Sequence, residues 1–166
     1  MRKLMTGGSI FLLTLAAAGP ALAEIEIPAA FCPNLKEVVA ETSQNFARFR
    51  GPLVETSTDD EGYVSNAYAS SLTLAGATLC VISEYKPPDS KALISYRCEW
   101  LPVGVTKSDV VAAVAIAVRR CVGIDDWMDH LDFYENDIAQ AAVYTDEFEV
   151  TISAGTAPRA FLWVRD

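Results

Sequence analysis

The sequence predicts an α+β protein with two helices packed on one face of a mostly antiparallel sheet, in the order α-β-β-α-β-β, and with two disulfides. Three observations indicate this fold class. Two segments repeat apolar residues at the helical period, several runs have the composition or alternation of strands, and four cysteines follow an export leader. The 166 residues fit a leader followed by a single domain over residues 24–166.

Residues 1–23 have the three parts of a secretory signal peptide. Arg2 and Lys3 make a positive start, an apolar stretch follows, and the tripeptide ALA at 21–23 is a small-residue cleavage site. The apolar stretch is too short to span about 30 Å of hydrocarbon, and no second long apolar segment follows. We therefore expect a periplasmic or secreted protein without a membrane span.

Residues 33–48 predict the first helix. Pro33 suits a first helical turn, and a Gly-Pro pair ends the segment. The next residues, 53–62, are polar and acidic and predict a surface loop, whereas residues 63–71 fit either a short strand or an irregular approach. The apolar face of the helix comprises Cys32, Leu35, Val39, Phe46 and Phe49.

Residues 72–85 and 91–101 predict an antiparallel hairpin, because both runs are rich in Leu, Val, Ile, Tyr and Trp. The tip between them holds Pro87 and Pro88, which cannot donate hydrogen bonds to a strand ladder. This rigid and exposed tip is either a plain turn or a loop that contacts a partner.

The even number of cysteines in an exported chain predicts two disulfides. A hairpin turn centred on residue 89 sets Cys80 opposite Cys98, and antiparallel helices would bring Cys32 beside Cys121. We favour these pairs over the alternative in which each helix is bonded to the sheet, as Cys32–Cys80 and Cys98–Cys121. In that alternative, Cys121 would lie about 20 Å from the start of its helix and Cys98 only about 10 Å from the end of its strand, so a helix that folds straight back would not bring the two together. Cysteines in pairs are structural, which removes them as nucleophiles.

Residues 107–122 predict the second helix. Thr106 or Ser108 can cap its start, and Gly123 can end it. Asp109 lies near the positive end of the helix. The apolar stripe of this buried helix comprises Val110, Val114, Val118 and Cys121.

The C-terminal part predicts two further strands. A short helix is expected around residues 127–131, before residues 142–154, which alternate as a half-buried strand with an irregularity near Asp146. Gly and Pro then mark a turn, and residues 159–165 form the last strand.

The negative net charge of the sequence bears on the kind of partner that the protein could bind. The full sequence has a formal net charge of −9, and cleavage would remove Arg2 and Lys3 but no acidic residue. A nucleic-acid partner is disfavoured, because phosphate binding requires clustered Lys and Arg. The acidic charge permits a basic protein partner, and it also serves solubility.

Few residues suggest catalysis. His130 is the single histidine, and Asp126 four residues earlier could orient its ring in a hydrolase, but no G-x-S-x-G elbow supplies a nucleophile. The alternative is a surface histidine in an acidic segment. Residues 125–137 are rich in carboxylates but lack the EF-hand order, so no metal site is predicted. No cofactor motif is present either.

We therefore expect a non-enzymatic protein-binding module, in the form of an inhibitor or immunity-type protein of the cell envelope. The alternative is a small envelope hydrolase that uses His130 or a pair of carboxylates. Core packing is expected for most aromatic residues, and an aromatic patch on the open sheet face would instead indicate protein recognition. The candidate interaction residues are Pro87, Pro88, Trp127 and His130.

Overall fold

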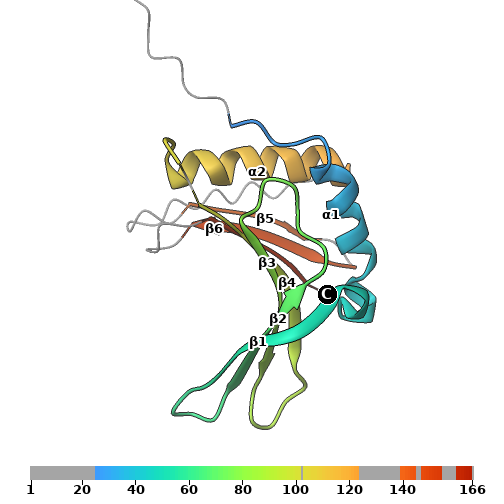
Figure 1. Ribbon diagram of the computed structural model, residues 1–166, viewed down its shortest axis with the longest axis vertical. Helices are drawn as coiled ribbons and strands as arrows, with labels where there is room; N and C mark the ends of the chain where they lie inside the picture. Colours follow the sequence, from blue (N-terminus) through green and yellow to red (C-terminus); the bar gives the residue numbers. More distant parts are fainter. Residues whose placement is uncertain (1–24, 102, 124–138, 145–146, 155–159, 166) are drawn as a thin grey trace, which may run out of the picture.

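The computed structural model confirms the predicted α+β fold (Figure 1). Within the residues that it describes, two helices lie on one face of an antiparallel sheet, and two disulfides join the favoured cysteine pairs. None of the helices in this part of the chain is long and apolar enough to cross a membrane. The described residues are 25–101, 103–123, 139–144 (backbone only), 147–154 and 160–165.

The described part of the chain contains more strands than the sequence predicted. Four strands precede the second helix and three follow it, where two and two were expected. The strands lie in the order β1-β2-β3-β4-β7-β6-β5, with every neighbouring pair antiparallel. The elements are α1 (Phe31–Ala40), η1 (Thr42–Gln44), η2 (Ala47–Phe49), β1 (Arg50–Thr58), β2 (Val64–Ser70), β3 (Leu79–Lys86), β4 (Leu93–Trp100), α2 (Lys107–Val122), β5 (Ala139–Tyr144), β6 (Glu149–Ala154) and β7 (Ala160–Arg165).

The first helix is shorter than the predicted segment 33–48. It ends at Ala40, and the short 3₁₀ turns η1 and η2 follow. Asn45 and Phe46 have left-handed φ values of 53° and 55°, which an α-helix does not allow. Phe46 and Phe49 are nevertheless buried. The apolar spacing therefore marked residues that face the core, but they reach it from two tight turns instead of one long helix.

The second helix has the predicted bounds, 107–122, and the predicted caps. Thr106 Oγ1 accepts a hydrogen bond from Asp109 N at 3.1 Å, and the Asp109 carboxylate accepts one from Thr106 N at 3.0 Å. The Thr106 hydroxyl also donates a hydrogen bond to the Asp109 carboxylate at 2.6 Å. The bonds that this carboxylate accepts from the Thr106 hydroxyl and backbone N lower the pKa of Asp109. Gly123 ends the helix in the left-handed conformation.

Strand β1 occupies much of the segment predicted to be a loop, residues 53–62. It is an edge strand, paired only with β2 and exposed from Pro52 to Thr58. Its ladder also has register shifts between Arg50 and Glu55. An exposed edge strand buries neither face, so its sequence lacks the alternation by which strands are recognised. Strand β2 settles the neighbouring ambiguous segment as a strand.

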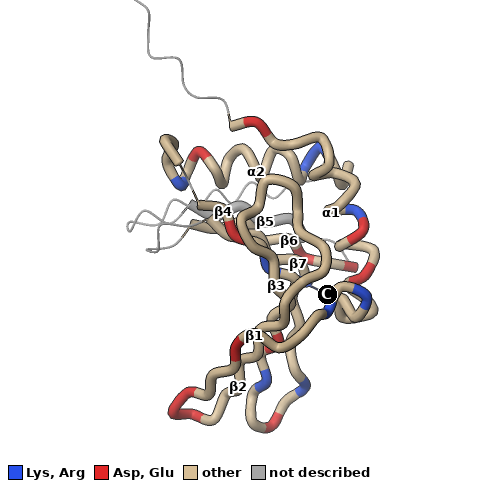
Figure 2. Tube along the Cα trace, in the orientation of Figure 1, with Lys and Arg blue, Asp and Glu red and all other residues tan. Residues whose placement is uncertain are grey.

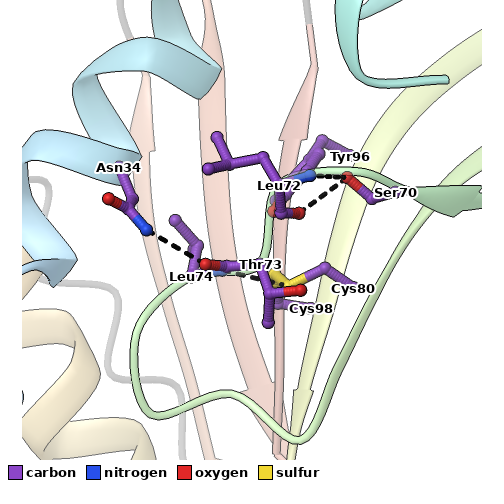
Figure 3. Close-up of a disulfide and its surroundings, with 8 residues drawn as sticks. All are labelled: Asn34, Ser70, Leu72, Thr73, Leu74, Cys80, Tyr96 and Cys98. Atoms are coloured by element: carbon purple, nitrogen blue, oxygen red, sulfur yellow. Dashed lines mark hydrogen bonds between the residues drawn. A yellow bond between two sulfur atoms is a disulfide. The ribbon is translucent and has the colours of Figure 1, made fainter.

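The central hairpin has the predicted register, with Cys80 opposite Cys98. Its first strand begins at Leu79 and not at residue 72, because residues 71–78 form a loop that crosses the helix side of the sheet. The Tyr96 hydroxyl donates a hydrogen bond to Leu72 O at 2.7 Å, which ties this loop to the strand beneath it (Figure 3). Leu74 in the same loop is fully buried.

Helix α1 also holds this loop, through Asn34. The Nδ2 atom of Asn34 donates a hydrogen bond to Thr73 O at 3.0 Å (Figure 3). Gly76 in the loop has a φ of +88°, and a Cβ atom there would lie 3.2 Å from Pro28 Cδ. Glycine is therefore required at this close approach of two backbone segments.

The C-terminal part of the chain contributes three strands to the sheet instead of the predicted two. The expected strand 142–154 is a hairpin of β5 and β6, whose ladder pairs Ala139 with Ala154. The predicted irregularity near Asp146 lies outside the described residues. Strand β7 lies where the last strand was predicted and pairs with both β6 and β4.

The hydrophobic core lies between the helices and the sheet. The disulfides Cys32–Cys121 and Cys80–Cys98 have Cα–Cα distances of 5.0 and 4.1 Å, and no cysteine is free. Figure 1 shows that the β1–β2 and β3–β4 hairpins extend past both helices. The fully buried side chains include Phe31, Leu35, Val38, Leu74, Ile82, Tyr96, Val111, Val114, Val118, Ile152, Leu162 and Val164.

Candidate functional site

The sheet has one face that neither helix covers. Successive strand residues point to opposite faces, so on β4 Tyr96 and Cys98 face the core and Arg97 points the other way. We call this second surface the open face. Its residues are Glu55 and Ser57 on β1, Ser65, Ala67 and Ala69 on β2, Leu79, Val81, Ser83 and Tyr85 on β3, Leu93, Ser95, Arg97 and Glu99 on β4, Glu149, Thr151 and Ser153 on β6, and Phe161, Trp163 and Arg165 on β7.

Large apolar side chains are exposed on the open face. Trp163 and Tyr85 are each 40% exposed, and Leu79 and Leu93 are about half exposed. Core packing was predicted for most aromatic residues, but strand alternation places Leu162 and Val164 in the core and Trp163 on the other side. The alternation in β7 itself was the signal that could have located this tryptophan.

The arginines of the open face are held by their own acidic partners. Arg97 Nη2 lies 2.7 Å from Glu99 Oε1, and its guanidinium carbon lies 5.4 Å from the ring centroid of Phe161. Arg165 Nε donates a hydrogen bond to Glu149 Oε2 at 2.8 Å. These contacts fix the orientation of both guanidinium groups and offset their charge locally.

Trp163 lies in the middle of a row of paired residues across the strands. Arg97 on β4 pairs with Trp163 on β7, which in turn pairs with Thr151 on β6. Val81 on β3 extends this row on the far side of Arg97. The Cβ atoms of directly paired residues lie about 4.5 to 5.5 Å apart, so Trp163 has a close neighbour on each adjacent strand.

A hollow lies at the β1–β4 end of the open face. Its volume is about 260 Å³. We call it the serine hollow, because short side chains form its floor and the longer Glu55, Tyr85 and Arg97 stand around it. Its lining residues are Glu55, Ser57, Ser65, Asn66, Ala67, Ser83, Glu84, Tyr85 and Arg97.

The predicted interaction residues Pro87 and Pro88 lie at the tip of the β3–β4 hairpin. Pro87 is half-buried and Pro88 is exposed. A Cβ atom at Gly62 would lie 3.7 Å from Pro88 Cγ, so the tips of the two hairpins meet. The aromatic rings of Tyr63 and Tyr85, one from each hairpin, stack with their centroids 5.4 Å apart. The Pro-Pro tip is thus beside the serine hollow, but it is not one of its walls.

The other predicted interaction residues, Trp127 and His130, lie outside the described residues. The same applies to Asp126, the proposed orienting partner of His130, and to the predicted signal peptide. Among the residues that the structure describes, no group of three or more His, Cys, Asp or Glu side chains could hold a metal ion. The hydrolase alternative therefore stays a prediction from the sequence.

Two further hollows, of about 640 and 360 Å³, flank residues 25–28 on the helix side. The smaller one is lined by Trp100, whose Nε1 atom is buried without a hydrogen-bond partner in the described part of the chain. This atom is shielded from solvent, so it offers no accessible donor in the wall of the hollow. The larger hollow is lined by apolar side chains together with the charged Glu26 and Arg120, and the smaller one is mainly apolar.

The fold and the open face define a disulfide-bonded α+β protein with an exposed aromatic and charged sheet surface. No family model, curated protein or solved structure matches this chain. The function must therefore be argued from the site itself.

Proposed function

We propose that this chain is an exported, non-enzymatic module that binds another protein through its open face, as an inhibitor or immunity-type protein of the cell envelope does. The observation that carries this proposal is the exposure of Trp163 and Tyr85 around the fixed guanidinium of Arg97. Trp, Tyr and Arg are the residues that most often dominate the binding energy of protein interfaces.

The rigidity of the surface also supports protein recognition. The open face is built on hydrogen-bonded strands, and its central residues Arg97 and Trp163 lie between neighbours on both sides. Such a surface loses little conformational freedom when a partner binds, so the entropy cost of ordering its side chains is small. The exposed Leu79 and Leu93 would be covered in the complex, which removes apolar surface from water.

Two observations support export and a basic partner. The two disulfides are compatible with an oxidising compartment, where such bonds form and persist. The net charge is −9, and Figure 2 shows acidic residues gathered at the tip of the β1–β2 hairpin. Complementary charge accelerates the encounter with a basic protein and disfavours acidic ones.

Site-specific cross-linking in the producing cells tests this proposal. A photoreactive amino acid is placed at Leu79 or Leu93 on the open face, and at Ile116 on the outer side of α2 as a control of similar exposure. We expect one common protein adduct from both open-face positions and none from Ile116. A Trp163→Ala change in the same background should reduce the adduct. Adducts from Ile116 alone, or none from the open face, would contradict the proposal.

A further inference from the structure

We propose that the serine hollow binds the cationic side chain of one Lys or Arg residue of the partner protein. This inference rests on the proposed function and names the chemistry by which the open face recognises its partner.

The shape of the hollow fits a single long side chain. Ser57 pairs with Ser65, and Ala67 pairs with Ser83, so four short side chains lie next to one another on three adjacent strands. Longer side chains surround this floor and leave about 260 Å³ between them. That volume is below the range of about 300 to 1,000 Å³ that is typical of small-molecule pockets. It is therefore better matched to one inserted side chain.

The uncompensated charge in the hollow is negative. Glu55 is exposed and makes no ion pair with another described residue. Arg97 is already paired with Glu99, at 2.7 Å. Glu84 also borders the hollow, but strand alternation directs its side chain to the other face, where it lies 3.5 Å from Arg50 and accepts a hydrogen bond from the Tyr68 hydroxyl. An entering cation would meet the Glu55 carboxylate, whereas an entering anion would be repelled by it.

The neutral groups of the hollow also favour a cation. The hydroxyl oxygens of Ser57, Ser65 and Ser83 offer lone pairs to the several N–H donors of an ammonium or guanidinium group. Tyr85 adds an aromatic ring, whose face attracts a cation within about 6 Å. Its stacking on Tyr63 keeps that ring in place.

The electrostatic potential at this end of the open face is also negative. Burial is the main reason that the pKa of Tyr85 is raised, and the nearby groups Tyr63, Asp59 and Glu61 raise it further. The acidic tip of the β1–β2 hairpin therefore adds a negative potential beside the hollow (Figure 2). A cationic side chain would be drawn to this end of the sheet.

An NMR titration of the oxidised, ¹⁵N-labelled protein tests the inference. The probes are N-acetyl-lysine N-methylamide and its uncharged counterpart N-acetyl-norleucine N-methylamide. The lysine probe should shift the amide signals of Glu55, Ser65, Ser83 and Tyr85, and the norleucine probe should not. Glu55→Gln should weaken binding of the lysine probe at least fivefold. Glu37→Gln, which removes the same charge from α1, should leave the binding unchanged.

Two results would overturn the inference: equal responses to both probes, or equal effects of Glu55→Gln and Glu37→Gln. The titration needs no partner, so its outcome is separate from that of the cross-linking. Open-face adducts without lysine binding would leave the proposed function standing and reject the cation site. Lysine binding without open-face adducts would reject the proposed function, and with it the partner residue inferred here.

Discussion

Arg97 on β4 lies directly opposite Trp163 on β7, on the face of the sheet opposite to the core residues Tyr96, Cys98, Leu162 and Val164. The guanidinium of Arg97 is held at 2.7 Å by Glu99, and Trp163 remains 40% exposed. Leu162 and Val164, the neighbours of Trp163 in β7, are buried in the core instead. Adjacent residues of one strand therefore divide between the core and the exposed surface. Substitutions at these residues should affect stability differently.

Adjacent residues of β7 should differ sharply in their effect on stability. Leu162 is fully buried, so Leu162→Ala should lower the free energy of unfolding by about 2 to 5 kcal/mol. Trp163→Thr keeps a residue suited to strands on the open face and should cost about 1 kcal/mol or less. Urea denaturation followed by circular dichroism measures both. A larger loss for Trp163→Thr would show that the tryptophan serves the core.

The two disulfides should contribute unequally. Cys32–Cys121 spans 89 residues and Cys80–Cys98 spans 18. Loop-closure entropy in the unfolded chain then predicts losses of about 4 to 5 kcal/mol and about 3 kcal/mol when each pair is replaced by alanine. Denaturant unfolding of the two double variants gives the comparison. The reverse order would mean that packing of the buried Cys80 and Cys98 outweighs the effect of loop length.

The capping box at Thr106 should be visible in both stability and pH dependence. Thr106→Ala should cost about 1 kcal/mol, whereas Thr106→Ser should retain most of the stability, because a serine hydroxyl can make the same cap. The pKa of Asp109 is lowered in the folded protein. Its contribution is therefore present above the unfolded pKa of about 3.9 and disappears as the pH falls through the lower folded value. Thermal unfolding between pH 2 and 6 should show a shallower acid limb for Asp109→Asn than for the wild type.

Tyr96 should make the fold sensitive to alkali. Burial strongly raises the pKa of this phenol, so the folded state favours its neutral form. The corresponding stability is present below the unfolded pKa of about 10 and is lost as the pH rises beyond it. Tyr96→Phe should flatten the alkaline limb and cost about 1 kcal/mol at neutral pH, because the 2.7 Å bond to Leu72 O is lost. An unchanged alkaline limb in this variant would assign the effect to another group.

Two glycines with positive φ values allow backbone strain to be separated from packing. Gly76 has a φ of +88° and would place a Cβ 3.2 Å from Pro28 Cδ, whereas Gly104 has a φ of +72° and open space around it. Gly104→Ala should therefore cost about 1 to 2 kcal/mol from strain alone. Gly76→Ala should cost more, and equilibrium unfolding of both variants measures the difference. Equal losses would show that the 71–78 loop yields without resistance.

The parts of the fold that were predicted correctly depend on local signals. The bounds of α2 follow from Thr106, Gly123 and the apolar stripe between them. The cysteine pairing follows from the register of one hairpin and from the ends of two helices. Neighbouring residues carried the information for α2 and for the hairpin register, whereas the Cys32–Cys121 pair required the start of one helix to lie beside the end of the other.

The parts that were missed depend on tertiary context. Strand β1 is held by backbone pairing with β2 and buries no apolar face, so its composition resembles a loop. The 71–78 loop is apolar because Leu74 enters the core, which made it resemble a strand. The serine hollow unites residues of four strands, and no local pattern relates Glu55 to Arg97. Only the order of the strands brings them together.

The central claim is that the open face is the surface that a partner covers. The most direct measurement is the affinity of the cross-linked partner, once purified, for the wild type, for the double variant Tyr85→Ala/Trp163→Ala and for Ile116→Ala. We expect the double variant to bind at least 30-fold more weakly, because the loss of a single interface hot spot costs about 2 kcal/mol or more. Ile116→Ala should bind as the wild type does. Equal affinities of all three proteins would contradict the claim.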